Sequence, residues 1–154
     1  MLKKTFLIFL LLFTSSCGYE ALHSKKNLDI FNFSIDKLIL IGDRDINLKI
    51  KEKLNNYTLN EKDKIFSLNI SSDAQKTILA KNTAGDPTSF KSTITVNVTV
   101  LLENKIKNKL QIIETFNYNN NSNTFDLKKY EREIRNNLAE TVTDKLIFKL
   151  SSIQ

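Results

Sequence analysis

The chain of 154 residues has few of the residue types on which metal sites and cofactor sites depend, with one histidine, one cysteine and three glycines. A metal centre takes several histidine, cysteine or carboxylate ligands, and here His23 and Cys17 stand alone. Three scattered glycines cannot form a glycine-rich loop that cradles phosphate. We therefore expect no metal, no nucleotide and no other cofactor, and a lone cysteine allows no disulfide within the chain.

Catalytic groups are also scarce. His23 lies in a segment without hydrophobic periodicity, which cannot hold a base rigidly beside a nucleophile. Glu131, Glu133 and Glu140 lie among lysines and arginines, so we expect them on a solvated helix face. The sequence predicts a binding or structural protein, not an enzyme. The net charge of +6 comes without a basic stripe interleaved with aromatic residues, so we expect no nucleic-acid partner.

The single cysteine follows a short apolar segment. Two lysines precede the uninterrupted apolar run of residues 6–13, and two serines stand directly before Cys17. A helix of that length rises about 12 Å, well short of the roughly 30 Å hydrocarbon core of a bilayer. The pattern is typical of a removable secretory signal, which we place at residues 1–16.

The end of this signal resembles the lipobox of bacterial lipoproteins, in which the cysteine thiol is linked to diacylglycerol and the freed α-amine is acylated. Thr14 departs from the pattern, in which leucine is usual. The resemblance implies lipidation of Cys17 and a lipidated tether over residues 17–29. Gly18, in place of aspartate, implies sorting to the outer membrane of a Gram-negative bacterium. The alternative is a plain signal peptide followed by an incidental buried cysteine.

Residues 30–154 carry the periodicities of one folded domain. Alternating apolar residues predict a strand over residues 30–41. The apolar run at its end indicates either burial on both faces or a bulge near Lys37. Asp43 is the expected N-cap of a helix that runs to about Tyr57.

Three further strands are expected, with polar turns at 82–88 and 103–109. The first covers residues 66–71 and either ends there or continues, with a kink, through 77–80, and the other two lie around 90–102 and 110–118. Glu114 is the odd member of the inward-facing set of the last strand. A loop at 119–124 precedes a long amphipathic helix from about Phe125 to Leu150. The order β-α-β-β-β-α predicts an α+β two-layer sandwich, a four-stranded, mainly antiparallel sheet packed against two helices.

Several segments resemble the LPS-assembly lipoprotein LptE family. The segment CGYEAL at residues 17–22 resembles the start of the mature members. Tyr118-Asn119 resembles the end of their last strand, and YEREIRNNLAE at residues 130–140 resembles their closing helix, although alanine is scarcer here. The resemblance implies that the domain plugs the lumen of the outer-membrane β-barrel LptD. It would help that barrel assemble and help lipopolysaccharide reach the outer leaflet.

The resemblance also implies surfaces for these partners. Polar residues of the strand at 90–102 would face the barrel lumen, namely Thr93, Thr95, Asn97 and Thr99. Lys76, Lys81 and Lys91 flank the turn at Asp86-Pro87, and lysine is a competent point-charge ligand for the phosphates of lipopolysaccharide. The alternative function is that of a free-standing, periplasm-facing lipoprotein, a scaffold or binding module without a barrel partner.

Overall fold

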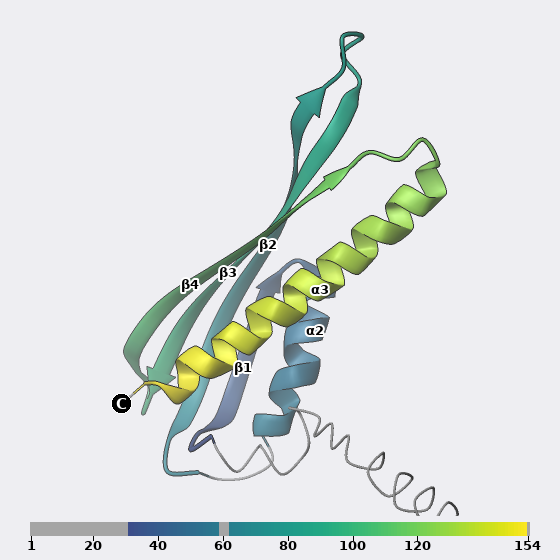
Figure 1. The fold of residues 1–154 in the computed structure, drawn as a ribbon. Coiled ribbons are helices and arrows are strands. Elements are labelled where there is room, and N and C mark those ends of the chain that lie inside the picture. The colour runs from purple at the N-terminus through teal and green to yellow at the C-terminus, as the bar shows by residue number, and fades with distance from the viewer. Residues whose placement is uncertain (1–30, 59–61, 154) are drawn as a thin grey trace, which may run out of the picture. The chain divides into compact units, whose positions relative to one another are not determined.

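The described part of the chain, residues 31–58 and 62–153 of a computed structural model, contains four strands and two α-helices (Figure 1). The predicted signal and tether, with Cys17, lie outside the described residues. The elements are β1 (Ser34–Gly42), α2 (Arg44–Leu54), the 3₁₀ turn η2 (Asn55–Tyr57), β2 (Ile65–Lys81), β3 (Pro87–Leu102), β4 (Lys105–Asn119) and α3 (Thr124–Ser151).

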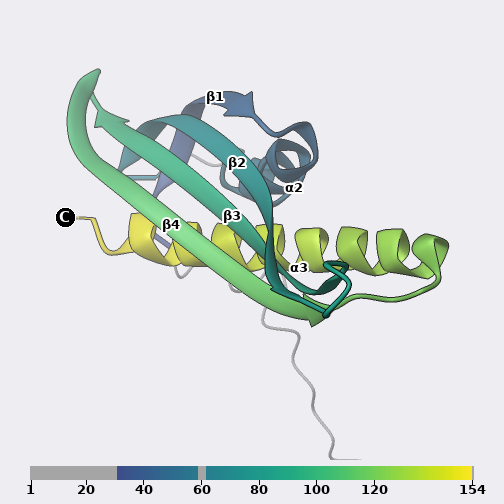
Figure 2. The ribbon, with the colours of Figure 1, turned by 90° about the horizontal axis from the view of Figure 1, so that it is seen from above.

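The strands form one sheet in the order β1-β2-β3-β4, and both helices lie on the same face of it (Figures 1 and 2). β1 pairs with β2 in parallel, whereas β2–β3 and β3–β4 are antiparallel. A parallel pair needs a crossover connection, which α2 provides. The predicted α+β class, with a mainly antiparallel sheet and two helices, is confirmed.

β1 contains the bulge that was one of the two alternatives. Its register against β2 shifts between Ile35 and Lys37, which changes the residues that face the helices. Ile35 is buried before the shift, and Leu38 and Leu40 pack against the core after it. The strand begins later than predicted, but Phe33, just before it, stacks on Tyr57 with ring centroids 5.0 Å apart.

The connection from β1 to α2 depends on two neighbouring residues. The Asp43 side chain accepts hydrogen bonds from the backbone N–H groups of Asp45 and Ile46, which confirms the predicted N-cap. Gly42 has a φ of +101°, and a Cβ there would lie 1.9 Å from the Ser72 carbonyl oxygen. Only glycine therefore fits at this close approach.

The α-helical part of the second element ends at Leu54, earlier than predicted, and the last turn to Tyr57 is 3₁₀. Two consecutive asparagines occupy this turn, and asparagine favours non-helical backbone because its side chain competes for backbone hydrogen bonds. The face of α2 that packs on the sheet is otherwise as predicted, with Ile46, Ile50 and Leu54 buried.

The turn between β3 and β4 is shorter than predicted. It consists of Glu103 and Asn104, with φ values of 50° and 62°, the left-handed pair of a type I′ hairpin. Residues 105–109, predicted as turn because of their polarity, instead form the first part of β4. They are polar because this is an edge strand with exposed side chains on both faces.

The core lies between the helices and the sheet. The inward residues of β3 from Phe90 to Val100 are buried as predicted, together with one face of α3. The largest fully buried side chains include Phe33, Phe66, Ile46, Ile50, Leu54, Leu68, Ile70, Ile94, Leu146 and Leu150. Tyr130, predicted in the buried stripe of α3, is 44% exposed because the first turns of the helix diverge from the hairpin (Figure 1).

Candidate functional site

The β2–β3 hairpin extends past the helices at its turn (Figure 1). We call residues 76–91 the hairpin arm, which carries the three predicted lysines. Asn82 orders its tip, since the Oδ1 atom accepts hydrogen bonds from the backbone N–H groups of Ala84 and Asp86 at 3.0 and 2.8 Å. Gly85 has a φ of +91°, which suits the turn. The turn chemistry predicted for this segment therefore forms the tip of the arm.

Lys76 lies on the helix-facing side of this arm. Its Nζ atom is 2.5 Å from Oε1 of Glu131 on α3 and 3.8 Å from the centre of the Phe90 ring. The same carboxylate oxygen accepts a hydrogen bond from the Tyr118 hydroxyl at 2.9 Å. This contact network joins β2, β3 and β4 to α3.

Glu131 was expected on a solvated helix face, and that expectation is wrong. Its side chain is 25% exposed, and its partners Lys76 and Tyr118 come from two strands, 55 and 13 residues away in the sequence. Burial of Tyr118 raises the pKa of its phenol, and the hydrogen bond to Glu131 raises the pKa further. Both effects favour the protonated hydroxyl that donates this bond.

The structure does not bring the three lysines onto one surface. Lys91 has the opposite parity on β3 from buried Phe90, so it projects from the other face of the sheet. Lys81 is exposed beside the tip, opposite Pro87. Lys76 is already paired with a carboxylate. Contact of the three lysines with lipopolysaccharide stays a prediction.

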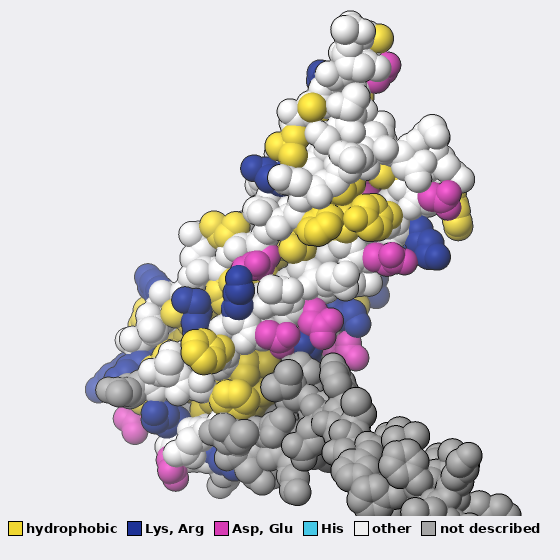
Figure 3. Space-filling model, viewed as in Figure 1, with side chains coloured by type: hydrophobic (Ala, Val, Ile, Leu, Met, Phe, Trp, Pro, Cys, Tyr) yellow, Lys and Arg dark blue, Asp and Glu magenta, His cyan; other side chains and the backbone are white. Residues whose placement is uncertain are grey.

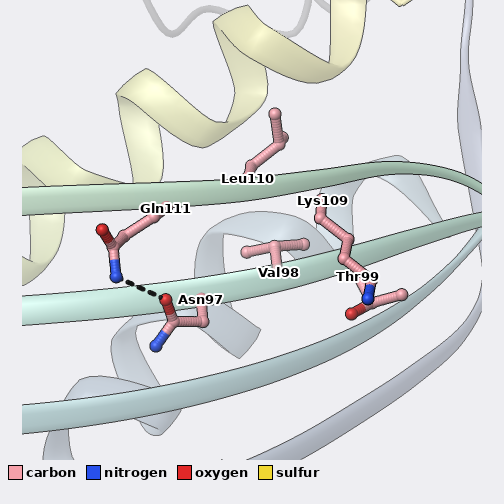
Figure 4. A pocket seen from close by; sticks show the side chains of 6 residues that line it. All are labelled: Asn97, Val98, Thr99, Lys109, Leu110 and Gln111. Atoms are coloured by element: carbon pink, nitrogen blue, oxygen red, sulfur yellow. Dashed lines mark hydrogen bonds between the residues drawn. The ribbon is translucent and has the colours of Figure 1, made fainter.

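The face of the sheet opposite the helices is polar along its centre. Thr93, Thr95 and Thr99 of β3 are half-buried on this face, and Asn97 is exposed. Figure 4 shows Asn97 beside Gln111 of β4, whose Nε2 atom donates a hydrogen bond to Asn97 Oδ1 at 2.9 Å. We call this the open face.

Exposed isoleucines lie toward both edges of the open face. Ile39 and Ile41 are on β1, opposite Asn69 and Ser71 of β2. On the other edge strand, Ile113 is exposed opposite a threonine of β3. The open face therefore has a hydrogen-bonding centre and apolar margins.

Ion pairs also connect α2 to α3, and another ion pair explains why the acidic residue Glu114 faces inward on β4. Lys53 of α2 contacts Asp144 at 2.6 Å and Glu140 at 3.0 Å, both on α3. Burial lowers the pKa of Lys53, but the hydrogen bonds to Asp144 and Glu140 outweigh it, and the pKa is raised. Glu114, the odd inward residue, pairs with Lys145 of α3.

The described surface includes two shallow pockets that are open to solvent. One is on α3 beside Phe148, and the other lies between β3 and β4 around Asn97 (Figure 4). Among residues 31–58 and 62–153, no three His, Cys, Asp or Glu side chains are grouped to hold a metal ion. In the same described part, neither α-helix combines the length and apolarity needed to cross a bilayer.

Several solved structures of bacterial lipoproteins share this fold. Rare lipoprotein B from Shewanella oneidensis superposes with a TM-score of 0.59 at 15% identity, over 75% of this chain and 94% of its own. A minor lipoprotein from Acinetobacter baumannii gives 0.60 at 14% identity, over 79% and 92%. Lipoprotein B from Nitrosomonas europaea gives 0.58 at 15% identity, over 79% and 83%.

These identities show a common fold and nothing finer. No protein-family model matches the sequence, and no curated protein matches it. The fold of the described residues is therefore one that known bacterial lipoproteins adopt.

Proposed function

We propose that this protein is an outer-membrane lipoprotein, anchored through Cys17, whose domain plugs an LptD-like β-barrel and helps lipopolysaccharide reach the outer leaflet. One observation carries the proposal, a cysteine directly after a secretory signal in a chain whose domain has the fold of solved lipoproteins. The resemblance of its sequence segments to the LptE family is the reason for proposing the barrel and lipopolysaccharide as its partners.

The surface of the domain suits a polar lumen. A wide barrel leaves a hydrophilic interior that needs filling, and the open face offers amide and hydroxyl groups along its centre. The charged sides of the helices, with Lys53, Glu140 and Asp144, would meet lumenal side chains in the same way. The proposal assigns a structural and binding role, without catalysis or a cofactor.

Co-purification tests the proposal. A tagged full-length chain, expressed in its native envelope and extracted in detergent, is expected to bring down a large barrel in equal amount. The barrel would be recognised by its heat-dependent mobility on a denaturing gel. A matched tagged chain with Cys17→Ser reports how much of the recovery depends on the anchor.

A monomeric lipoprotein without any barrel contradicts the plug. That result favours the other function, a free-standing, periplasm-facing scaffold or binding module. Direct contact with lipopolysaccharide is tested separately, by replacing Lys76, Lys81 and Lys91 with glutamate and measuring lipopolysaccharide binding to the purified mature chain. Unchanged affinity removes these lysines from the proposal.

A further inference from the structure

Lysines gather at one end of the domain, where β1 begins, the β3–β4 turn lies and α3 ends (Figures 1 and 3). Lys105, Lys107 and Lys109 are exposed on β4, and Lys149 is exposed in the last turn of α3. None of the four forms an ion pair with a described residue. We call these four residues the basic end.

Few acidic groups oppose this charge. Glu103 lies in the adjacent turn, Asp36 is exposed near the start of β1, and Asp63 lies just before β2. Asp63 already accepts a hydrogen bond from the Asn32 side chain at 2.8 Å. Lys145 is excluded from the basic end because it pairs with Glu114. An excess of positive charge therefore remains on this end.

Two large apolar side chains stand among these lysines. Phe148 is 71% exposed, one residue before Lys149, and Ile106 is 60% exposed between two lysines of β4. Neither side chain contributes to the core. Exposed aromatic and aliphatic groups beside lysines are suited to binding at the bilayer interface. There the apolar groups enter the acyl region and the ammonium groups contact phosphate.

The described chain enters the domain at this same end. The Ser34 N–H donates to the Lys64 carbonyl at 2.8 Å, and Lys64 Nζ donates to the Ile153 carbonyl at 2.7 Å, just after α3. The interval from Cys17 to Phe31 spans at most about 50 Å when fully extended. A lipid on Cys17 would keep this entry point, and with it the basic end, within that distance of the bilayer.

We propose that the basic end docks on the anionic glycerophospholipid head groups of the leaflet that carries the anchor. The inference rests on the lipidation in the proposed function. Charge complementarity supplies the attraction, since each lysine near an anionic bilayer raises affinity about fivefold. Phe148 and Ile106 add apolar contact.

The test uses the full mature chain with Cys17→Ser, so that no lipid contributes to binding. It is sedimented with vesicles of phosphatidylcholine alone and of phosphatidylcholine mixed with phosphatidylglycerol. We expect binding to the mixed vesicles only, and weaker binding at high salt, because counter-ions screen surface charge. The variant Lys105→Gln, Lys107→Gln, Lys109→Gln, Lys149→Gln is expected to lose at least about tenfold in affinity.

A matched variant removes the same charge from the other end. Arg44→Gln, Lys128→Gln, Lys129→Gln, Arg132→Gln changes four exposed cations at the start of α2 and in the first turns of α3, away from the basic end. It is expected to bind the mixed vesicles as the parent does. Thermal unfolding of both variants checks that each is folded.

Three outcomes overturn the proposal. The first is absence of binding to the mixed vesicles, and the second is an equal loss of affinity in the basic-end variant and in the matched variant. The third is tighter binding when lipopolysaccharide replaces phosphatidylglycerol. The last would assign the basic end to lipopolysaccharide. These measurements involve neither a lipidated chain nor a barrel. A negative result would therefore not contradict lipidation of Cys17 or binding to a barrel, which are tested by their own experiments.

Discussion

At the residue scale, Glu131 connects the hairpin arm to the long helix. One oxygen of its carboxylate accepts from Lys76 of β2 and from Tyr118 of β4. The Lys76 side chain is 43% exposed, so its ion pair contributes little to stability. The hydrogen bond from the Tyr118 hydroxyl contributes more, since Tyr118 is buried and losing the bond leaves its hydroxyl without this partner.

Glu131→Ala is expected to lower the free energy of unfolding by about 1 kcal/mol, mostly through the lost Tyr118 hydrogen bond. Urea titration followed by circular dichroism measures this change. Glu133→Ala is the matched control, because Glu133 is exposed two residues away and forms no hydrogen bond or ion pair with a described residue. Equal effects of the two substitutions would contradict a special role for Glu131.

The raised pKa of Tyr118 predicts a pH dependence. Burial and the bond to Glu131 stabilise the protonated phenol in the folded state. That stabilisation is complete below the ordinary pKa near 10 and is lost as the pH rises above it, since the unfolded chain ionises first. The parent should therefore lose more stability between neutral pH and pH above 10 than Tyr118→Phe does. Parallel losses would contradict the shift.

At the scale of the elements, several boundaries follow from short-range chemistry and others from the sheet. Asp43 begins α2 as its side chain requires, and the buried parity of β3 follows from its alternating residues. The predicted start of β4 was wrong, because polarity alone does not distinguish a turn from an edge strand. The bulge in β1 was left between two alternatives because only the pairing with β2 reveals it.

The two positive-φ glycines give a matched test of the β1–α2 connection. Gly42→Ala brings a Cβ into the Ser72 carbonyl and is expected to cost at least about 2 kcal/mol. Gly85→Ala has no neighbour within 4 Å and is expected to cost about 1 kcal/mol, from the backbone conformation alone. Thermal unfolding compares them, and a cost at residue 85 equal to that at residue 42 would contradict the close approach.

At the scale of the whole molecule, one layer of helices covers one face of the sheet. The other face, the hairpin arm and the basic end remain available to partners. The lipid anchor and the folded domain are predicted from separate segments of the sequence, and only the proposed function combines them. The proposed anchor would be a covalent modification of Cys17, and so it has its own test.

Cys17→Ser is expected to release the protein from the membrane fraction, because several acyl chains on one residue anchor it far more strongly than surface charge does. Fractionation after a high-salt wash separates the two contributions, since salt screens only the charge. Mass spectrometry of the mature parent chain should find diacylglycerol and an N-acyl chain on Cys17. A free thiol there would contradict the lipoprotein assignment.

The sequence by itself determined the class of fold, the N-cap at Asp43 and the buried faces of α2 and β3, because these depend on the chemistry and periodicity of neighbouring residues. Tertiary structure alone decided that Glu131 binds Lys76 and Tyr118, that Lys91 is on the other face from Lys76, and that the basic end assembles from β4 and α3. These arrangements join segments tens of residues apart, so they depend on strand register and helix packing, which local patterns do not specify.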